Sequence, residues 1–238
     1  SNGVSIRGGS LDQNLMLYES APVFNPTHLF GLFSVFTPDV ISGVDIYQAN
    51  IPANYGGRIA SVVNVKVKNP YIDSFKLEGG IGLISSRLTI TTPIIKDKLM
   101  LLAGGRSGFT DFLFPLLIPR LKNTKANFTD ATIKLLYIPN ENNQLTYTHF
   151  LSNDFYQLDL ISSIENIVSS ENQYDFGTKN HTLKWLHTFQ NNTNLTGKLI
   201  HSNYLPENLF PEIDSDNVIR FKSQIQFTSG QFEFKDNR

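Results

Sequence analysis

The segment DATIKLLY, residues 130–137, alternates polar and apolar side chains along most of its length. Successive side chains of a β-strand point to opposite faces of a sheet, so this alternation predicts a strand with one wet face and one apolar face. The polar side chains are Asp130, Thr132 and Lys134, and the apolar ones are Ala131, Ile133, Leu135 and Tyr137.

The same period of two recurs from about Phe75 to the end of the chain, where we count about eight or nine predicted strands and no convincing helix. These segments run to about ten residues or more, which is longer than usual globular strands and suits tilted strands that cross a membrane. Other apolar faces comprise Phe75 and Leu77; Leu183, Trp185, His187 and Phe189; and Ile219, Phe221, Ile225 and Phe227.

The predicted connections between these strands differ in length. Short turns are expected at 96–98, 139–143, 190–194 and 229–230, and longer links at 107–126, 154–175 and 205–217. Short connections at one end of a sheet and long ones at the other are typical of transmembrane β-barrels. A soluble β-sandwich has no reason to sort its connections in this way.

The composition limits the classes of protein to consider. Among the 238 residues 17% are charged, which is low for a soluble domain, and 12% are aromatic. The net charge of −1 gives no basic surface for nucleic acid, and the absence of cysteine excludes disulfides and thiolate metal sites. There is no apolar run long enough for a transmembrane helix and no signal peptide, so we expect an exported protein to lack its N-terminus here.

Residues 1 to about 70 show a different sequence pattern, in which short apolar runs are separated by Gly and Pro. The run SVVNVKVK, residues 61–68, alternates as a strand should, and residues 38–41 predict a short helical turn with Thr37 as its N-cap. We therefore expect a small α+β unit with long loops before the strand-rich region.

A sheet that spans lipid must close on itself, because every backbone polar group needs a partner within the protein. A closed barrel of eight strands would be filled by its own side chains and could not enclose residues 1–70. A receptor-sized barrel of about 22 strands would need on the order of 450 residues. The chain is thus predicted to be a fragment with an incomplete barrel.

Two stretches resemble the plug domain of TonB-dependent outer-membrane receptors. The first is IRGGSLDQN followed by LMLYESAPV, residues 6–23, although Glu19-Ser20 stands where that family usually has Asp-Gly. The second runs from YGGR, residues 55–58, through SVVNVKVK and resembles the end of the plug. Between them, NPTHLFGLFSVF, residues 25–36, resembles a nutrient-scavenging branch of the family, as do PIIKDK at 93–98 and GGR at 104–106.

This resemblance implies a mainly β fold, with the C-terminal part of a plug over residues 1–70 and the first eight or nine strands of a large barrel over residues 71–238. It implies an outer-membrane receptor that imports a scarce nutrient (a glycan, peptide or metal chelate) into the periplasm, not an enzyme, and without a cofactor. Its partners would be the TonB complex through the missing N-terminal part, outer-membrane lipid, the small-molecule or oligomeric nutrient and, as a candidate, a surface lipoprotein, but no nucleic acid.

In such receptors the loop that matches residues 25–36 lies at the plug's extracellular apex. Aromatic side chains there would stack on a flat ligand or pack the plug against the barrel wall, and we leave both alternatives open. The predicted substrate-facing residues are Asn25, His28, Phe30, Phe33 and Phe36.

The remaining motifs have structural interpretations. Arg7, Gly8, Tyr55, Gly56 and Gly57 are predicted to maintain the plug, with Arg7 pairing an inward carboxylate such as Glu78. The glycine pairs do not match any phosphate-binding pattern and predict tight turns and close backbone approach. The histidines form no metal-binding or catalytic pattern, so no catalytic or metal site is predicted, and we expect them at the rim of the sheet.

Two rival functions remain open from the sequence. One is a soluble β-sandwich for carbohydrate binding or adhesion, which would be soluble without detergent and would lack aromatic girdles. The other is a small passive porin-like barrel, against which the first seventy residues argue.

Overall fold

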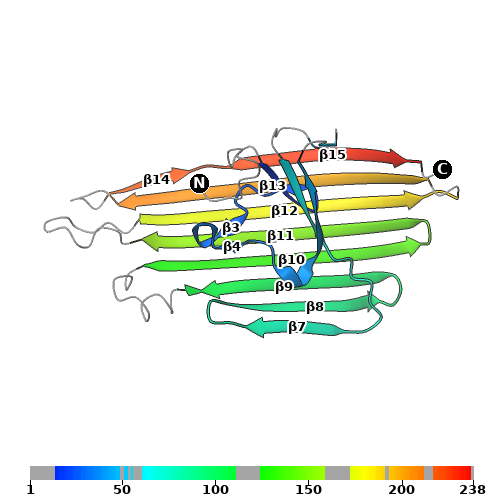
Figure 1. The fold of residues 1–238 in the computed structure, drawn as a ribbon, viewed down its shortest axis with the longest axis horizontal. Coiled ribbons are helices and arrows are strands. Elements are labelled where there is room, and N and C mark those ends of the chain that lie inside the picture. Colours follow the sequence, from blue (N-terminus) through cyan, green and yellow to red (C-terminus); the bar gives the residue numbers. More distant parts are fainter. Residues whose placement is uncertain are drawn as a thin grey trace.

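The computed structural model describes residues 14–48, 51–52, 55, 61–110, 124–158, 172–190, 193–211 and 217–236. These residues form one large antiparallel sheet, one small mixed sheet and a two-stranded hairpin (Figure 1). The helical elements bounded within these residues are two short 3-10 turns, and none of their helices is long and apolar enough to cross a membrane. The prediction of a mainly β chain is confirmed.

The large sheet contains nine strands among the described residues, and β7 to β13 each pair with the next strand along the chain. β14 pairs with residues 207–211 at the C-terminal end of β13, and β15 pairs with residues 194–204 of the same strand. Together β14 and β15 form one interrupted strand. The interruption falls at Ser223, whose backbone N–H donates to the carbonyl of Pro206 at 3.0 Å. The strands are β7 (Lys76–Ile81), β8 (Ser85–Ile95), β9 (Leu99–Phe109), β10 (Lys125–Asn140), β11 (Asn143–Leu158), β12 (Asn172–Thr188), β13 (Asn194–Pro211), β14 (Val218–Lys222) and β15 (Ile225–Lys235).

The predicted short turns at 96–98, 139–143 and 190–194 are confirmed, because each joins two neighbouring strands of the sheet. The predicted turn at 229–230 is wrong: Ser229 and Gly230 lie inside β15, opposite Ile200 and Leu199 of β13. Ser-Gly is a turn signal only where the chain must reverse, and the register with β13 keeps this one extended. The three predicted longer links follow β9, β11 and β13, and all lie at one end of the sheet. The connection between β7 and β8 lies at the same end but is short.

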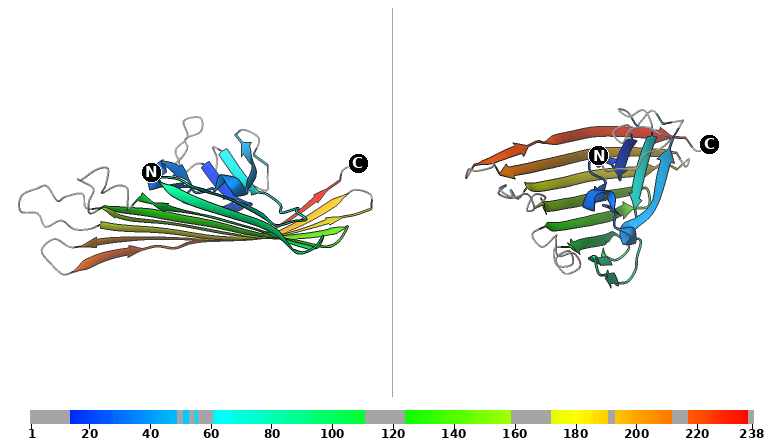
Figure 2. Two further views of the ribbon diagram at one scale, coloured as in Figure 1. Left: turned by 90° about the horizontal axis from the view of Figure 1, so that it is seen from below. Right: turned by 60° about the vertical axis from the view of Figure 1, so that its left-hand side comes forward.

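The small sheet has the strand order β2-β1-β6-β5, in which β1 and β6 run parallel. Its strands are β1 (Asn14–Tyr18), β2 (Ala21–Pro22), β5 (Ile41–Tyr47) and β6 (Ser61–Val67). Between β2 and β5 come the hairpin β3 (Thr27–His28) and β4 (Phe33–Ser34) with the 3-10 turn η2 (Leu29–Gly31), and then the 3-10 turn η3 (Pro38–Val40). The small sheet lies over one face of the curved large sheet (Figure 2).

The predicted helical turn is present as η3, with Pro38 at its start and Thr37 at the N-cap position. However, the Thr37 side chain makes no capping hydrogen bond. Its hydroxyl donates instead to a carboxylate oxygen of Asp130 on β10. The residue that predicted a helix cap therefore contacts the large sheet instead of capping the turn.

The two faces of the large sheet have the opposite polarity to a soluble sheet. The face beneath the small sheet, hereafter the inner face, buries polar side chains such as Thr148, Asn180 and Ser202. The outer face exposes large apolar side chains, among them Leu199 at 61% and Phe232 at 80% of full exposure. A soluble sandwich buries its apolar face, whereas the wall of a membrane barrel turns that face outward.

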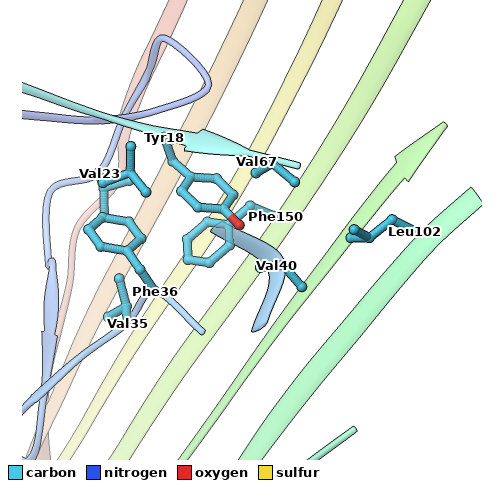
Figure 3. Close-up of a cluster of buried hydrophobic side chains, with 9 residues drawn as sticks. Tyr18, Val23, Val35, Phe36, Val40, Val67, Leu102 and Phe150 are labelled. Atoms are coloured by element: carbon cyan, nitrogen blue, oxygen red, sulfur yellow. The ribbon is translucent and has the colours of Figure 1, made fainter. Parts of the chain in front are cut away.

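An apolar cluster joins the two layers at one place (Figure 3). Tyr18 of β1 stacks on Phe36 at a centroid distance of 5.3 Å and meets the ring of Phe150 of β11 at 4.6 Å. Leu102 of β9 also belongs to this cluster, beside Val40 of η3. The inner face is therefore polar overall, with an apolar contact where the small sheet docks.

Candidate functional site

The segment between β2 and β5 folds back onto the inner face through the hairpin β3–β4. The backbone turns sharply at η2, where Leu29 and Gly31 have φ angles of 48° and 102°. The Leu29 backbone N–H donates to the Tyr156 hydroxyl of β11 at 2.7 Å. This hydrogen bond ties the turn to the large sheet and brings His28 against it.

His28 is completely buried between two aspartates of the large sheet. Its Nδ1 lies 2.8 Å from Asp154 Oδ1, and its Nε2 lies 3.0 Å from Asp130 Oδ2. Carboxylates accept hydrogen bonds, so an imidazole between two of them donates from both nitrogens and carries a positive charge. Burial lowers the pKa of His28, but the hydrogen bonds to Asp130 and Asp154 outweigh it and raise the pKa above its ordinary value.

Arg106 of β9 supplies a second cation to this group. Its Nε and Nη2 atoms lie 3.0 and 2.8 Å from Asp130 Oδ2, and Nη2 also donates to the backbone carbonyl of Ser34. Thr37 donates to the other oxygen of Asp130. We call His28, Thr37, Arg106, Asp130 and Asp154 the His28 cluster; its two carboxylates balance its two cations, as buried charges require.

Two further groups satisfy Asp154. The Asn25 amide donates to Oδ2 at 3.1 Å, and the Tyr156 hydroxyl donates to Oδ1 at 2.9 Å. The His28 ring also stacks on Phe128 at a centroid distance of 4.3 Å, with Phe33 on the same ring at 6.2 Å. The loop is thus held by hydrogen bonds and by ring packing at once.

A second anchor lies at the tight turn between β1 and β2. Glu19 and Ser20 have φ angles of 49° and 74°, which is the left-handed geometry that explains why Asp-Gly suits this turn. The Glu19 carboxylate accepts hydrogen bonds from the Val67 backbone N–H at 2.6 Å and from Lys134 Nζ at 3.1 Å. Nearby, the hydroxyl of Tyr18 lies 2.7 Å from Thr132 Oγ1, and burial raises the pKa of this tyrosine.

Aromatic side chains continue along the inner face toward the end of the sheet that carries the longer links. Tyr156, Phe176, Tyr174, Phe210 and Phe221 follow one another at centroid distances of 6.2, 6.5, 5.8 and 5.9 Å. We call these five residues the aromatic row. The register places Phe221 opposite Asn208 on the inner face, so the apolar side of β14 faces inward, unlike the apolar sides of β10 to β12.

No protein-family model and no curated protein matches this chain. Solved structures do match it in fold. A double mutant of the ferric enterobactin receptor PfeA from Pseudomonas aeruginosa aligns over 96% of the chain with a TM-score of 0.68 and 12% identity. The ferripyoverdine receptor of the Pseudomonas aeruginosa outer membrane aligns over 93% with a TM-score of 0.61 and 13% identity, and the siderophore receptor PirA from Acinetobacter baumannii over 96% with the same score and identity.

The chain has the fold of TonB-dependent outer-membrane receptors. It spans 39%, 33% and 38% of the lengths of these three structures. At 12–13% identity the likeness concerns the fold, and the resemblance inferred from the plug motifs is confirmed at that level.

The receptor fold brings together only some of the predicted site residues. His28 and Phe36 are buried against the large sheet, which is the packing alternative for the loop. Asn25 and Phe33 are partly exposed beside them, and their contact with a ligand remains a prediction. Phe30 lies in η2, but its side chain is outside the described residues.

The predicted plug-motif residues are mostly outside the described part of the chain. Arg7, Gly8, Gly56 and Gly57 fall there, so the predicted pairing of Arg7 with Glu78 is not visible. Tyr55 is described and lies 5.4 Å from the ring of Tyr47 of β5. Glu78 lies 3.0 Å from Lys76, two residues away on β7.

The sequence did not identify Asp130, Asp154 or Arg106 as members of the site. Asp130 was predicted on the polar side of a strand, Arg106 was singled out only as part of the GGR motif, and Asp154 was predicted at the start of a longer link, whereas it lies inside β11. Their convergence depends on the register of β9, β10 and β11, which alternation alone does not supply. Within the described residues, no group of three His, Cys, Asp or Glu side chains is arranged to hold a metal ion.

Proposed function

We propose that the chain is part of a TonB-dependent receptor that resides in the outer membrane and imports a scarce nutrient into the periplasm. In this proposal residues 1–70 are the C-terminal part of the plug and residues 71–238 are the first strands of the barrel wall. The polarity of the large sheet carries the proposal, because an apolar outer face suits lipid and a polar inner face suits a water-filled or plugged lumen. A soluble β-sandwich would expose the polar face and bury the apolar one.

Among glycans, peptides and metal chelates, we propose a ferric chelate as the nutrient. The similar structures are named as receptors for ferric enterobactin, ferripyoverdine or siderophores. The aromatic row and Phe33 support a flat organic ligand, since they present rings on the inner face beyond the His28 cluster. The TonB complex would act through the part of the protein that precedes this chain.

In this proposal, energy coupling would have to break the contacts that hold the plug residues against the large sheet. The His28 cluster connects the β3–β4 hairpin and Thr37 to β9, β10 and β11, and the ion pair between Glu19 and Lys134 connects the turn between β1 and β2 to β10. Separating one partner of a buried ion pair costs about 3–5 kcal/mol. A plug held in this way would stay closed until an external pull disrupts these contacts. Import then requires no covalent chemistry.

Uptake by cells that express the full-length protein tests this proposal. We expect energised uptake of a ⁵⁵Fe-labelled ferric chelate that disappears when the gene is deleted or the proton gradient is collapsed. Fluorescent oligosaccharide and peptide serve as competing substrates, and uptake of either in place of the chelate would contradict the nutrient class. A protein that stays soluble without detergent would contradict the receptor itself.

Binding variants test the ligand surface separately. Phe33→Ala and Phe210→Ala each remove one ring, which is worth about 0.5–1.5 kcal/mol, so chelate affinity should fall about two- to tenfold. Phe234→Ala on the exposed outer face is the matched control and should leave affinity unchanged. Unchanged affinity in both inner-face variants would remove the aromatic row from the proposed site.

A further inference from the structure

Three lysines lie on the inner face of the large sheet, toward the end that carries the short turns. Lys184 of β12 is directly opposite Lys198 of β13, and Lys134 lies two strands from Lys184 on β10. β12 ends at Thr188 and β13 begins at Asn194, so the opposed pair is close to the turn that joins these strands. We call Lys134, Lys184 and Lys198 the lysine cluster.

The charges of the lysine cluster act on one another. Like charges directly opposite each other destabilise an antiparallel sheet, so the pair of Lys184 and Lys198 is costly by itself. Lys184 is also within electrostatic range of Lys134, so the three ammonium groups form one positive patch. The carboxylates within range are Glu19 and Glu233, of which Glu233 on β15 is exposed and forms no ion pair with the described part of the chain.

The contacts of the lysine cluster leave part of its charge unbalanced. Lys134 Nζ lies 3.1 Å from a carboxylate oxygen of Glu19. Lys198 Nζ lies 3.4 Å from the hydroxyl of Ser20, which is a neutral group. Among the residues that the structure describes, Lys184 has no hydrogen-bond or ion-pair partner. Lys134 therefore fastens the turn between β1 and β2, but the other two ammonium groups have no carboxylate in contact within this part of the chain.

The turn between β1 and β2 covers the lysine cluster. Its residues Glu19 and Ser20 make the two contacts just described. β2 then continues over the neighbouring part of the inner face, where the Asn180 amide and the Ser202 hydroxyl both donate to the Pro22 carbonyl, at 3.1 and 2.7 Å. Displacement of this one segment would uncover the lysines and the polar surface beside them together.

The inner face of β12 connects the lysine cluster with the aromatic row. Phe176 of the row is followed on this face by Thr178, Asn180 and Thr182, which are all buried, and then by Lys184. Phe176 and Lys184 are separated by roughly 27 Å of strand. A ligand that moves along β12 from the aromatic row toward the short turns meets uncharged polar groups first and positive charge last. In a membrane barrel the short turns lie on the periplasmic side.

We propose that the lysine cluster is a second binding site for an anionic ferric chelate, which the turn between β1 and β2 masks until the small sheet is pulled away. The proposal rests on the function proposed above and narrows its ligand to a chelate with excess negative charge, such as one with catecholate groups. The Glu19 carboxylate occupies part of the site in the docked state. Ligand oxygens would replace it through charge-assisted hydrogen bonds, and the positive patch would raise the local concentration of the anion near the short turns.

Uptake of two ferric chelates by cells that express the full-length receptor tests this site. One ⁵⁵Fe-labelled chelate is a tris-catecholate, which is anionic, and the other is a tris-hydroxamate, which is neutral. We expect the double variant K184Q/K198Q to import the catecholate about tenfold more slowly at saturation, because two partly exposed ion pairs together contribute about that factor. Its affinity for the chelate in cells without a proton gradient should equal that of the wild type, since the lysine cluster is masked there.

Two controls separate a binding role from a structural one. Lys235→Gln is the matched control, since Lys235 of β15 lies on the same face, opposite Asn194, and outside the cluster. It should import the catecholate at the wild-type rate, and K184R/K198R, which keeps both charges, should retain most of the uptake. The urea concentration at which the small sheet separates from the large one should be unchanged in K184Q/K198Q.

The lysine site would be overturned by wild-type uptake in K184Q/K198Q, by an equal loss in K184R/K198R, or by preferential import of the neutral chelate in the wild type. A lower urea midpoint in K184Q/K198Q would also overturn it, because the lysines would then only hold the small sheet in place. A full-length protein that shows no energised uptake of either chelate would instead contradict the proposed function, so the two failures are distinguishable.

Discussion

Replacing His28 with leucine should weaken the docking of the β3–β4 hairpin, and of the small sheet that it connects to, on the large sheet more than any other single change in the loop. The variant removes a completely buried cation and leaves Asp130 and Asp154 facing each other with Arg106 as their nearest cation. Two charge-assisted hydrogen bonds are lost, each worth about 1.5–3 kcal/mol, and a carboxylate remains buried and under-compensated. The expected loss in the free energy of docking is about 3–5 kcal/mol.

The assay is equilibrium urea titration of the full-length receptor in detergent, with a fluorophore on the small sheet that reports its separation from the wall. With a slope of about 1–3 kcal/mol per molar urea, the midpoint should fall by roughly 2 M. Asn25→Ala is the matched control, because it removes one neutral donor to Asp154 and should cost only about 1.5 kcal/mol, the low end for a hydrogen bond to a charged group.

A rescue variant makes the reasoning refutable. His28→Leu combined with Asp154→Asn removes one carboxylate together with its cation and leaves Asp130 paired with Arg106, so much of the lost free energy should return. A midpoint for His28→Leu within experimental error of the wild type would show that the His28 cluster does not hold the small sheet. Failure of the double variant to recover would show that shape, and not charge balance, causes the loss.

Three further predictions concern the same interface. Ser20→Gly should stabilise the docked small sheet by about 1 kcal/mol, because Ser20 has a φ of 74°, and the urea midpoint should rise where Ala at this position lowers it. Gly104→Ala should destabilise it by about 1–3 kcal/mol, because the added Cβ would lie 2.4 Å from Val40 Cγ1, whereas Gly105→Ala, which meets only the Asp130 carbonyl at 3.5 Å, should be tolerated. The raised pKa of His28 means that its stabilisation is complete below its unfolded pKa of about 6.5 and is lost as pH rises through the raised value, so midpoints measured from pH 6 to 10 should fall in the wild type and lose that step in His28→Gln.

The large sheet, β7 to β15, was the part of the chain that the sequence predicted best. Alternation over residues 130–137 placed Asp130, Thr132 and Lys134 on one face, and the structure buries all three on the inner face. The pattern could not say which face would be covered, because alternation is symmetrical with respect to in and out. Only the exposed apolar side chains of the outer face decide it.

The sequence predicted close approach at the glycine pair 104–105, but it could not say which residue approaches. Close backbone approach was predicted for such pairs, and Gly104 does admit Val40 of η3 to the inner face. Gly108, which the sequence did not single out, admits the ring of Phe128, since a Cβ there would lie 2.1 Å from that ring. Phe128 lies opposite Gly108 in the same sheet and stacks on His28, so this glycine makes room for the ring against which a residue of the site packs.

The loop that includes residues 25–36 could be located from the sequence, but the roles of its residues could not. His28 is polar and Phe36 is aromatic, so both looked suited to an exposed ligand surface, yet both are buried against the large sheet. Their burial depends on Asp130, Asp154 and Phe150, which lie about a hundred residues further along the chain and meet the loop only through the strand register. Contacts of such long sequence separation leave no local pattern.

The two histidine arrangements differ for a physical reason that follows from the polarity of the sheet. On the inner face His28 meets two carboxylates and is held charged, so it acts as a fixed part of the interface. On the outer face His149, His181 and His201 lie opposite one another on β11, β12 and β13 and hydrogen-bond to hydroxyl and carbonyl groups. The same residue type therefore forms buried ion pairs where the large sheet meets the β3–β4 hairpin, and bonds to neutral groups where that sheet faces outward.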